Sequence, residues 1–104
     1  MIWARLSLAA ALGLGSAQGL PVVEGFDGFL DGDLLTNQLT GLTFANAVIL
    51  SAGLSLNEFD FPPRSGFNVV SDLGGPIVIT FDSPVAAILA YLTYAVGVTI
   101  TAYL

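Results

Sequence analysis

Apolar and polar residues alternate along the C-terminal part of this chain. In the segment VTITAYL, residues 98–104, every second residue is apolar and the residues between are Thr, Thr and Tyr. The segment IVITFD, residues 77–82, alternates in the same way. A period of two sends successive side chains to opposite faces of a β-strand. Both segments are therefore predicted to be half-buried strands, with Val98, Ile100 and Ala102 turned inward.

Shorter stretches with strand character fill the rest of the chain between turn residues. We expect strands at 22–26, 34–38, 54–61, 68–71 and about 86–95, and two short strands or one bent strand at 42–50. Pro62 and Pro63 should end the strand at 54–61, because proline cannot donate to a ladder. Short strands that recur every ~8–12 residues, with turn signals between them, are typical of an all-β protein. The predicted fold class is an antiparallel β-sandwich of the jelly-roll kind.

The predicted sandwich is short, and its last strand runs to Leu104 without a closing turn. Sandwich domains of this kind take about 100 residues, and a terminal apolar strand leaves ladder groups uncovered unless something pairs with it. We therefore expect a domain that is incomplete at its C-terminus. The alternative is a compact fold with this strand at an edge.

The first nineteen residues have the pattern of a secretory signal peptide. Arg5 supplies a positive charge, residues 6–14 are apolar apart from Ser7, and small residues that end at Ala17 or Gly19 suit a signal peptidase. We predict a helical signal peptide at 1–19 and a single β-sandwich domain at 20–104, which is secreted or held in the cell envelope. The alternative is a buried N-terminal helix.

A second alternative places the chain in a membrane. Residues 83–104 carry no charge, and a stretch of roughly 20 apolar residues suffices to span a bilayer. However, this stretch is rich in β-branched residues and no basic residues flank it. We expect no membrane association after leader removal, and keep a membrane anchor at 84–104 as the alternative.

Charge and composition exclude several functions. The chain has eight acidic and two basic residues, and removing Arg5 with the leader takes the formal charge from −6 to −7. Such a protein repels polyanions, so we expect no nucleic-acid partner. It contains no cysteine and no histidine, which excludes disulfides and any Ser-His-Asp or Cys-His catalysis within the chain.

Four carboxylates lie within ten residues near the first predicted strand. Glu24, Asp27, Asp31 and Asp33 alternate with glycines that free backbone carbonyls. Oxygen ligands of this kind suit Ca²⁺, so a structural calcium ion is one interpretation. The other is that the Asp-Gly pairs form ordinary turns, since the spacing matches no EF-hand loop.

The segment SLNEFDFPPRSG, residues 55–66, supplies a second set of candidates. On a strand, Glu58 and Asp60 would share one face about 7 Å apart at ~3.3 Å rise per residue, with Phe59 and Phe61 on the inner face. Carboxylate pairs serve glycoside hydrolysis, so a hydrolase fragment is an alternative. The simpler interpretation is a solvated face with Arg64 as counter-ion, open to weak ligand contact.

Tyr103 is the candidate ring for a sugar ligand. It shares the outward face of the predicted last strand with Thr99 and Thr101, and an exposed aromatic ring can pack against the flat face of a saccharide. Packing in the core or at an interface is the competing interpretation of Tyr103.

Three segments together resemble a known family. They are FDGFLDGDLLTNQLTGLTFANAVILSAG (26–53), SLNEFDFPPRSGFNVV (55–70) and GGPIVITFDSPVAAILAYLTY (74–94). In this order they resemble exported bacterial β-sandwich domains of the PEP-CTERM sorting-domain-containing type. The family's sorting tail is absent, so anchoring to the cell surface is not implied. The resemblance implies a non-enzymatic envelope or matrix module, with an extracellular polysaccharide or an envelope protein as partner.

Overall fold

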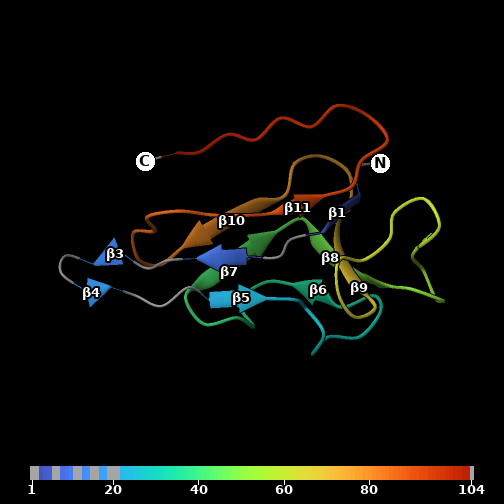
Figure 1. Cartoon of the computed structure of the whole chain (residues 1–104), viewed down its shortest axis with the longest axis horizontal. Coiled ribbons are helices and arrows are strands. Elements are labelled where there is room, and N and C mark those ends of the chain that lie inside the picture. The colour runs from blue at the N-terminus through green and yellow to red at the C-terminus, as the bar shows by residue number, and fades with distance from the viewer. Residues whose placement is uncertain (1–2, 6–7, 11–12, 15–16, 19–21, 104) are drawn as a thin grey trace.

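The computed structural model describes residues 3–5, 8–10, 13–14, 17–18 and 22–103. Its described residues form β-strands and loops without a helix, and every ladder between named strands is antiparallel. The main sheet has five strands in the order β11-β1-β9-β8-β6 (Figure 1). Their bounds are Trp3–Arg5 for β1, Leu34–Leu35 for β6, Ala47–Ser51 for β8, Asn68–Asp72 for β9 and Tyr91–Leu92 for β11.

Three two-stranded ladders accompany this sheet. They pair β7 (Leu42–Ala45) with β10 (Val78–Phe81), β2 (Leu8–Ala10) with β5 (Val22–Glu24), and β3 (Gly13–Leu14) with β4 (Ala17–Gln18). The ladder of β7 and β10 runs from Val78 opposite Ala45 to Phe81 opposite Leu42. The alternation of the segment at 77–82 therefore does correspond to a strand.

The core lies where β8 and β9 pair. Both strands are buried along most of their length, and their apolar residues, Ala47 to Leu50 in β8 and Val69 and Val70 in β9, lie next to each other across the ladder. Ile49 and Val70 face each other across the ladder and have no exposed surface. Phe26 packs edge-on against Phe44, with ring centroids 6.2 Å apart and an interplanar angle of 83°. Burying a side chain of this size stabilises a fold by about 1.5–3 kcal/mol.

Asn46 separates β7 from β8 and fixes the neighbouring turn. Its φ is 60°, a left-handed conformation that asparagine tolerates better than most residues. Its side-chain amide nitrogen donates to the carbonyl oxygens of Gly74, Gly75 and Pro76 at 2.9–3.1 Å. Because the left-handed backbone at Asn46 interrupts the extended chain, the segment 42–50 forms two short strands, one of the two forms that the sequence allowed.

Several expectations from the sequence are confirmed. The described chain is all-β and antiparallel, with strands that lie in or overlap the segments expected at 22–26, 34–38, 42–50, 68–71 and 77–82. The finer assignment, a β-sandwich of the jelly-roll kind, stays a prediction.

The strand predicted at 54–61 is wrong. Residues 53–61 are mostly turns, in which Leu54 N donates to the Ser51 carbonyl and Phe61 N to that of Asn57. The Asn57 side chain bonds to Asp60, and local bonds of this kind compete with a ladder. Phe59, expected on an inner face, is 91% exposed.

The predicted last strands are wrong over most of their length. In the segment at 86–95 only Tyr91–Leu92 is a strand, and residues 97–103 form no ladder. Figure 1 shows this C-terminal segment running apart from the sheet. Ile100 is 77% exposed, whereas the alternation predicted that its side chain points inward. A period of two defines a face, but it provides no neighbouring strand with which to pair.

The helical form expected for residues 1–19 is also wrong at the described positions. There β1 pairs with β9 and β11, β2 with β5, and β3 with β4. Pairing with a sheet can override the helix preference of Leu and Ala. Residues 1–2, 6–7, 11–12, 15–16 and 19 lie outside the described residues, and cleavage of the leader stays a prediction.

The membrane alternative required a helix at 84–104. The described residues of that segment contain β11 and irregular backbone. Nowhere in the described part of the chain does a helix have the length and apolar character that crossing a bilayer requires.

Two isoleucines test the position of the core. Ile49→Ala should lower the free energy of unfolding by about 2–5 kcal/mol, because it leaves a cavity between β8 and β9. Ile100→Ala makes the same change on an exposed side chain and should shift it by less than about 0.5 kcal/mol. Urea denaturation followed by circular dichroism measures both. If both variants lost the same free energy of unfolding, the structure would be contradicted and Ile100 would belong to the core.

Candidate functional site

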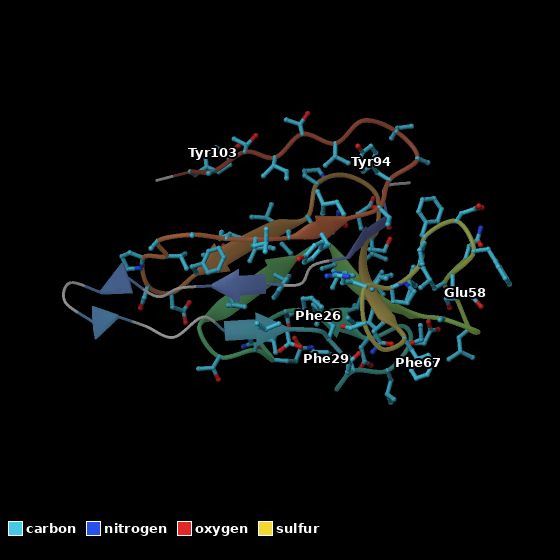
Figure 2. The ribbon with its side chains drawn as sticks, in the orientation of Figure 1. Phe26, Phe29, Glu58, Phe67, Tyr94 and Tyr103 are labelled. Carbon is cyan, nitrogen blue, oxygen red and sulfur yellow. The ribbon has the colours of Figure 1, made fainter. Side chains whose placement is uncertain are left out.

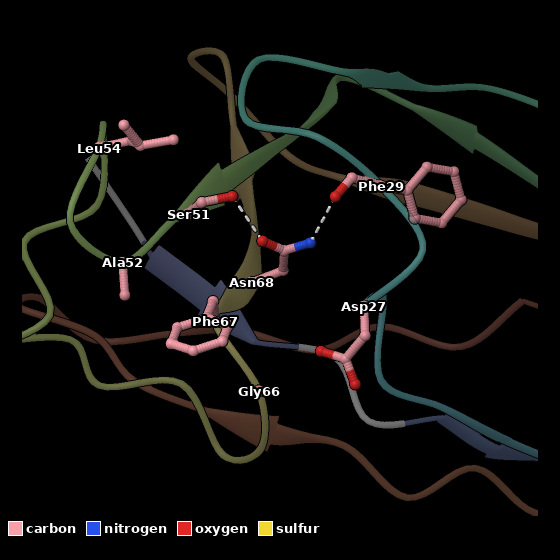
Figure 3. Close-up of a pocket in the computed structure, with 8 residues that line it drawn as sticks. All are labelled: Asp27, Phe29, Ser51, Ala52, Leu54, Gly66, Phe67 and Asn68. Carbon is pink, nitrogen blue, oxygen red and sulfur yellow. Dashed lines mark hydrogen bonds between the residues drawn. The ribbon is translucent and has the colours of Figure 1, made fainter.

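An open pocket of about 460 Å³ lies where two loops meet the ends of β8 and β9 (Figure 3). One wall belongs to the loop 26–33, and the other to the two ends of the loop 52–67. The lining residues are Asp27, Phe29, Ser51, Ala52, Leu54, Gly66, Phe67 and Asn68. This set combines apolar side chains with few polar groups, the usual composition of a small-ligand site.

The buried side chain of Asn68 forms the base of the pocket. Its amide nitrogen donates to the carbonyl oxygens of Phe26 at 2.7 Å and Phe29 at 2.8 Å. Its amide oxygen accepts from the Ser51 hydroxyl at 2.5 Å. Asn68 and Ser51 are also partners in the ladder of β8 and β9. The amide thereby ties the loop 26–33 to the main sheet, as the dashed lines in Figure 3 show for Ser51 and Phe29.

Asp31 holds the other loop in place. Its carboxylate accepts from the Ser51 backbone N–H at 2.8 Å, and from the Ser55 hydroxyl at 2.6 Å and N–H at 3.4 Å. The Ser55 hydroxyl, followed by the Ser51 N–H, holds the pKa of Asp31 below its ordinary value, because both bonds stabilise the ionised form. Asp31 thus remains a carboxylate while it bridges the two loops.

The carboxylate of Asp27, unlike that of Asp31, is not tied to another loop by hydrogen bonds of the described residues. No hydrogen bond from the described residues reaches its carboxylate, and it is the one charged group among the lining residues. It packs against Gly66, where a Cβ atom would overlap its oxygens and where φ is +56°. Glycine at this position therefore gives the carboxylate its place at the pocket.

The rim of the pocket is apolar. The Phe67 side chain is 71% exposed, and Leu54 is similarly open to solvent. The Phe67 carbonyl accepts from Ala52 N–H at 2.7 Å, which fixes the backbone that carries the ring. An exposed phenylalanine on a held backbone offers a flat apolar surface beside the Asp27 carboxylate.

The four carboxylates proposed for calcium do not converge. Glu24 accepts from Phe26 N–H at 2.6 Å and Asp33 from Leu30 N–H at 2.8 Å, so each caps its own turn. Among the described residues, no three acidic side chains lie close enough together to hold a metal ion. This geometry matches the turn interpretation, and the calcium site stays a prediction.

The second predicted set is also dispersed. Asp60 accepts from the Asn57 side-chain amide at 2.7 Å. The Arg64 guanidinium lies 4.5 Å from the centre of the Tyr91 ring, a cation–π contact rather than the expected pairing with Glu58 or Asp60. Figure 2 places Glu58 and Tyr103 far apart in the molecule. Because residues 54–61 are not a strand, the shared face predicted for Glu58 and Asp60 is wrong.

Of the pocket residues, only Asp27 was a candidate in the sequence; the missed ones include Ser51, Phe67 and Asn68. Asn68 opens a buried apolar run, and a polar residue at that place signals a required hydrogen-bond partner. Nothing in the sequence separates Phe67 from the six other phenylalanines.

Comparisons of the chain with known protein families, curated proteins and solved structures found no match. The resemblance to exported β-sandwich domains depends on the quoted motifs alone and stays a prediction.

The Asn68 network can be tested with a matched pair of substitutions. Asn68→Asp replaces the donor to two buried carbonyls by an acceptor, and should lower the free energy of unfolding by about 2–5 kcal/mol. Asn37→Asp makes the same change on the surface, where the side chain accepts only from the Thr36 hydroxyl, and should have little effect. Chemical denaturation compares them. Similar losses in both variants would contradict the role of Asn68.

The Asp31 bridge predicts a pH dependence. Its pKa is lower in the folded chain than in the unfolded chain, so its contribution is complete above the unfolded value of ~4. The contribution is lost as pH falls through the folded value. Ser55→Ala removes the largest cause of the shift, and should make stability fall less steeply with acid than in the natural chain. Denaturation curves at neutral and acidic pH measure the loss of stability in both chains. If Ser55→Ala and the natural chain lost the same stability with acid, the role of Asp31 would be contradicted.

Proposed function

We propose that the protein is a non-catalytic, exported β-sandwich module of the cell envelope or extracellular matrix, and that the pocket at Asp27 and Phe67 binds a saccharide. The partner is then an extracellular polysaccharide, or an envelope protein that carries one. The observation that supports this most directly is that one pocket combines an exposed aromatic ring with a carboxylate that has no hydrogen-bond partner among the described residues.

Each group of the pocket matches one part of a sugar. A saccharide presents C–H groups on one face of its ring and hydroxyl groups at the edge. The exposed ring of Phe67 and the neighbouring Leu54 suit the C–H face. The oxygens of Asp27 can accept bonds from hydroxyl donors, and a charged acceptor makes such bonds about twice as strong as neutral ones.

The base of the pocket is suited to binding without rearrangement. The side-chain polar atoms of Asn68 and Ser51 already bond to each other, and those of Asn68 bond also to the loop 26–33. A preorganised site loses less conformational entropy when its ligand arrives. The rim, by contrast, retains free surface for contact.

The titratable groups favour binding over hydrolysis. Hydrolysis of a glycosidic bond normally requires two carboxyl groups on either side of the bond. Asp27 is the single titratable side chain among the lining residues. Glu58 and Asp60, the pair considered from the sequence, lie in a turn and line no part of this pocket.

Export is the part of the proposal that depends on sequence. The pattern at residues 1–19 is that of a signal peptide, and the acidic, cysteine-free chain that follows resembles exported β-sandwich domains. Secretion of the chain from a bacterial host would support this part separately from ligand binding. Cleavage after Ala17 or Gly19 would also remove β1 and β2, so the sheet edges of β9, β11 and β5 that they cover would have to pair differently in the mature chain.

The binding proposal predicts a difference between two exposed phenylalanines. On a glycan array followed by calorimetry, the chain should retain at least one saccharide. Phe67→Ala should weaken binding about tenfold or more, because it removes the surface on which the sugar packs. Phe59→Ala removes an exposed ring outside the pocket, and should leave the affinity unchanged. Absence of any retained glycan, or equal losses in both variants, would contradict the proposal.

A further inference from the structure

We infer that the saccharide bound by this pocket carries a free amino group, and that the pocket prefers its ammonium form over neutral or acidic sugars. This inference extends the proposed function, since it names the chemical class of the ligand. It depends on the charge at Asp27, on the field around the pocket and on the aromatic ring beside it.

Among residues 23–103, no basic side chain pairs with the Asp27 carboxylate. Between residues 23 and 103 the one basic residue is Arg64, and its guanidinium lies over Tyr91. No described side chain donates a hydrogen bond to Asp27, although its oxygens are held against Gly66. A fixed carboxylate at an apolar rim is stabilised most by a cation that also donates hydrogen bonds, and an ammonium group is both.

The surroundings of the pocket reinforce this preference. The loop 26–33 also carries Asp31 and Asp33. Asp31 is bonded to the backbone of Ser51, a pocket residue, and the same bond helps to keep it ionised. The whole chain has a formal charge of −6. Such a field raises the local concentration of cationic ligands and disfavours uronic acids and sulfated sugars.

The aromatic ring adds a second attraction. An ammonium group close to the face of an aromatic ring is attracted by the negative potential of that face, and more strongly when it is desolvated. Phe67 is exposed and lines the same pocket as Asp27. An N-acetyl group on the same sugar would abolish the charge, and with it both the ion pair and the cation–π contact.

The test compares three matched oligosaccharides by titration calorimetry on the full chain. They are a glucosamine oligomer, its N-acetylated counterpart and a glucose oligomer of equal length, in weakly acidic, low-salt buffer where the amine is protonated. The glucosamine oligomer should bind about tenfold or more tightly than either of the others, as expected for one charge-assisted bond. Added salt should reduce this preference.

Two charge variants assign the effect to the pocket. Asp27→Asn is nearly isosteric, and should abolish the preference for the amine while the neutral oligomers still bind. Asp82→Asn removes one exposed carboxylate that lines no part of the pocket, and should retain the preference. Thermal melting should show that both variants are folded, since no hydrogen bond of the described residues depends on either carboxylate.

The outcomes separate the inference from the proposed function. Equal affinity for all three oligomers would overturn the inference and leave saccharide binding intact. Equal weakening of all three by Asp27→Asn would also overturn it, because the carboxylate would then act only on hydroxyl groups. If Asp82→Asn lost the preference for the amine as fully as Asp27→Asn, the inference would also be overturned, because the preference would then come from the overall charge of the chain. If none of the oligomers binds, the inference fails, and with no other saccharide retained the proposed function fails as well.

Discussion

The hydrogen bonds of the Asn68 amide are the interaction on which the rest of the described structure depends. The amide is buried, where an unsatisfied polar group costs about 1–3 kcal/mol, and its three bonds offset that cost. Phe26, whose carbonyl accepts one of them, has a φ of 62° and no exposed surface. The same amide therefore places an aromatic ring in the core and positions the loop 26–33 beside the pocket.

The two aspartates of this loop show how structural and binding roles divide. Asp31 accepts three hydrogen bonds and bridges to Ser55, so its lone pairs are committed to the fold. Asp27, four residues earlier, accepts none from the described residues. The first carboxylate stabilises the loops, and the second leaves acceptor capacity at the pocket. Two residues of the same type thus differ in role because their surroundings differ. A count of carboxylates in the sequence cannot show this difference, and for that reason it suggested a metal site.

The sequence predicted the strands that have both an apolar run and clear end signals, such as 68–71 and 77–82. It failed where the outcome depends on a partner. The alternation at 98–104 defines two faces, but the structure provides no adjacent strand for it, and the turn bonds of Asn57 prevail at 54–61. The pocket could be predicted only in part. Asp27 stood out by charge. Asn68, in contrast, gains its role from contacts between segments about 40 residues apart, and Phe67 from the loop ends that its backbone joins at Ala52.

Arg64 connects these observations with the electrostatics of the site. A free arginine in the loop 52–67 would be the nearest internal cation for the carboxylates around the pocket. Its guanidinium instead lies over Tyr91, at β11 on the edge of the main sheet. A cation–π contact of this kind is worth about 0.5–1 kcal/mol at an exposed site, comparable to an exposed ion pair. The contact with Tyr91 therefore competes with a surface salt bridge on equal terms, and it leaves Asp27 uncompensated. The pocket stays anionic because the fold directs Arg64, the one basic residue between residues 23 and 103, elsewhere.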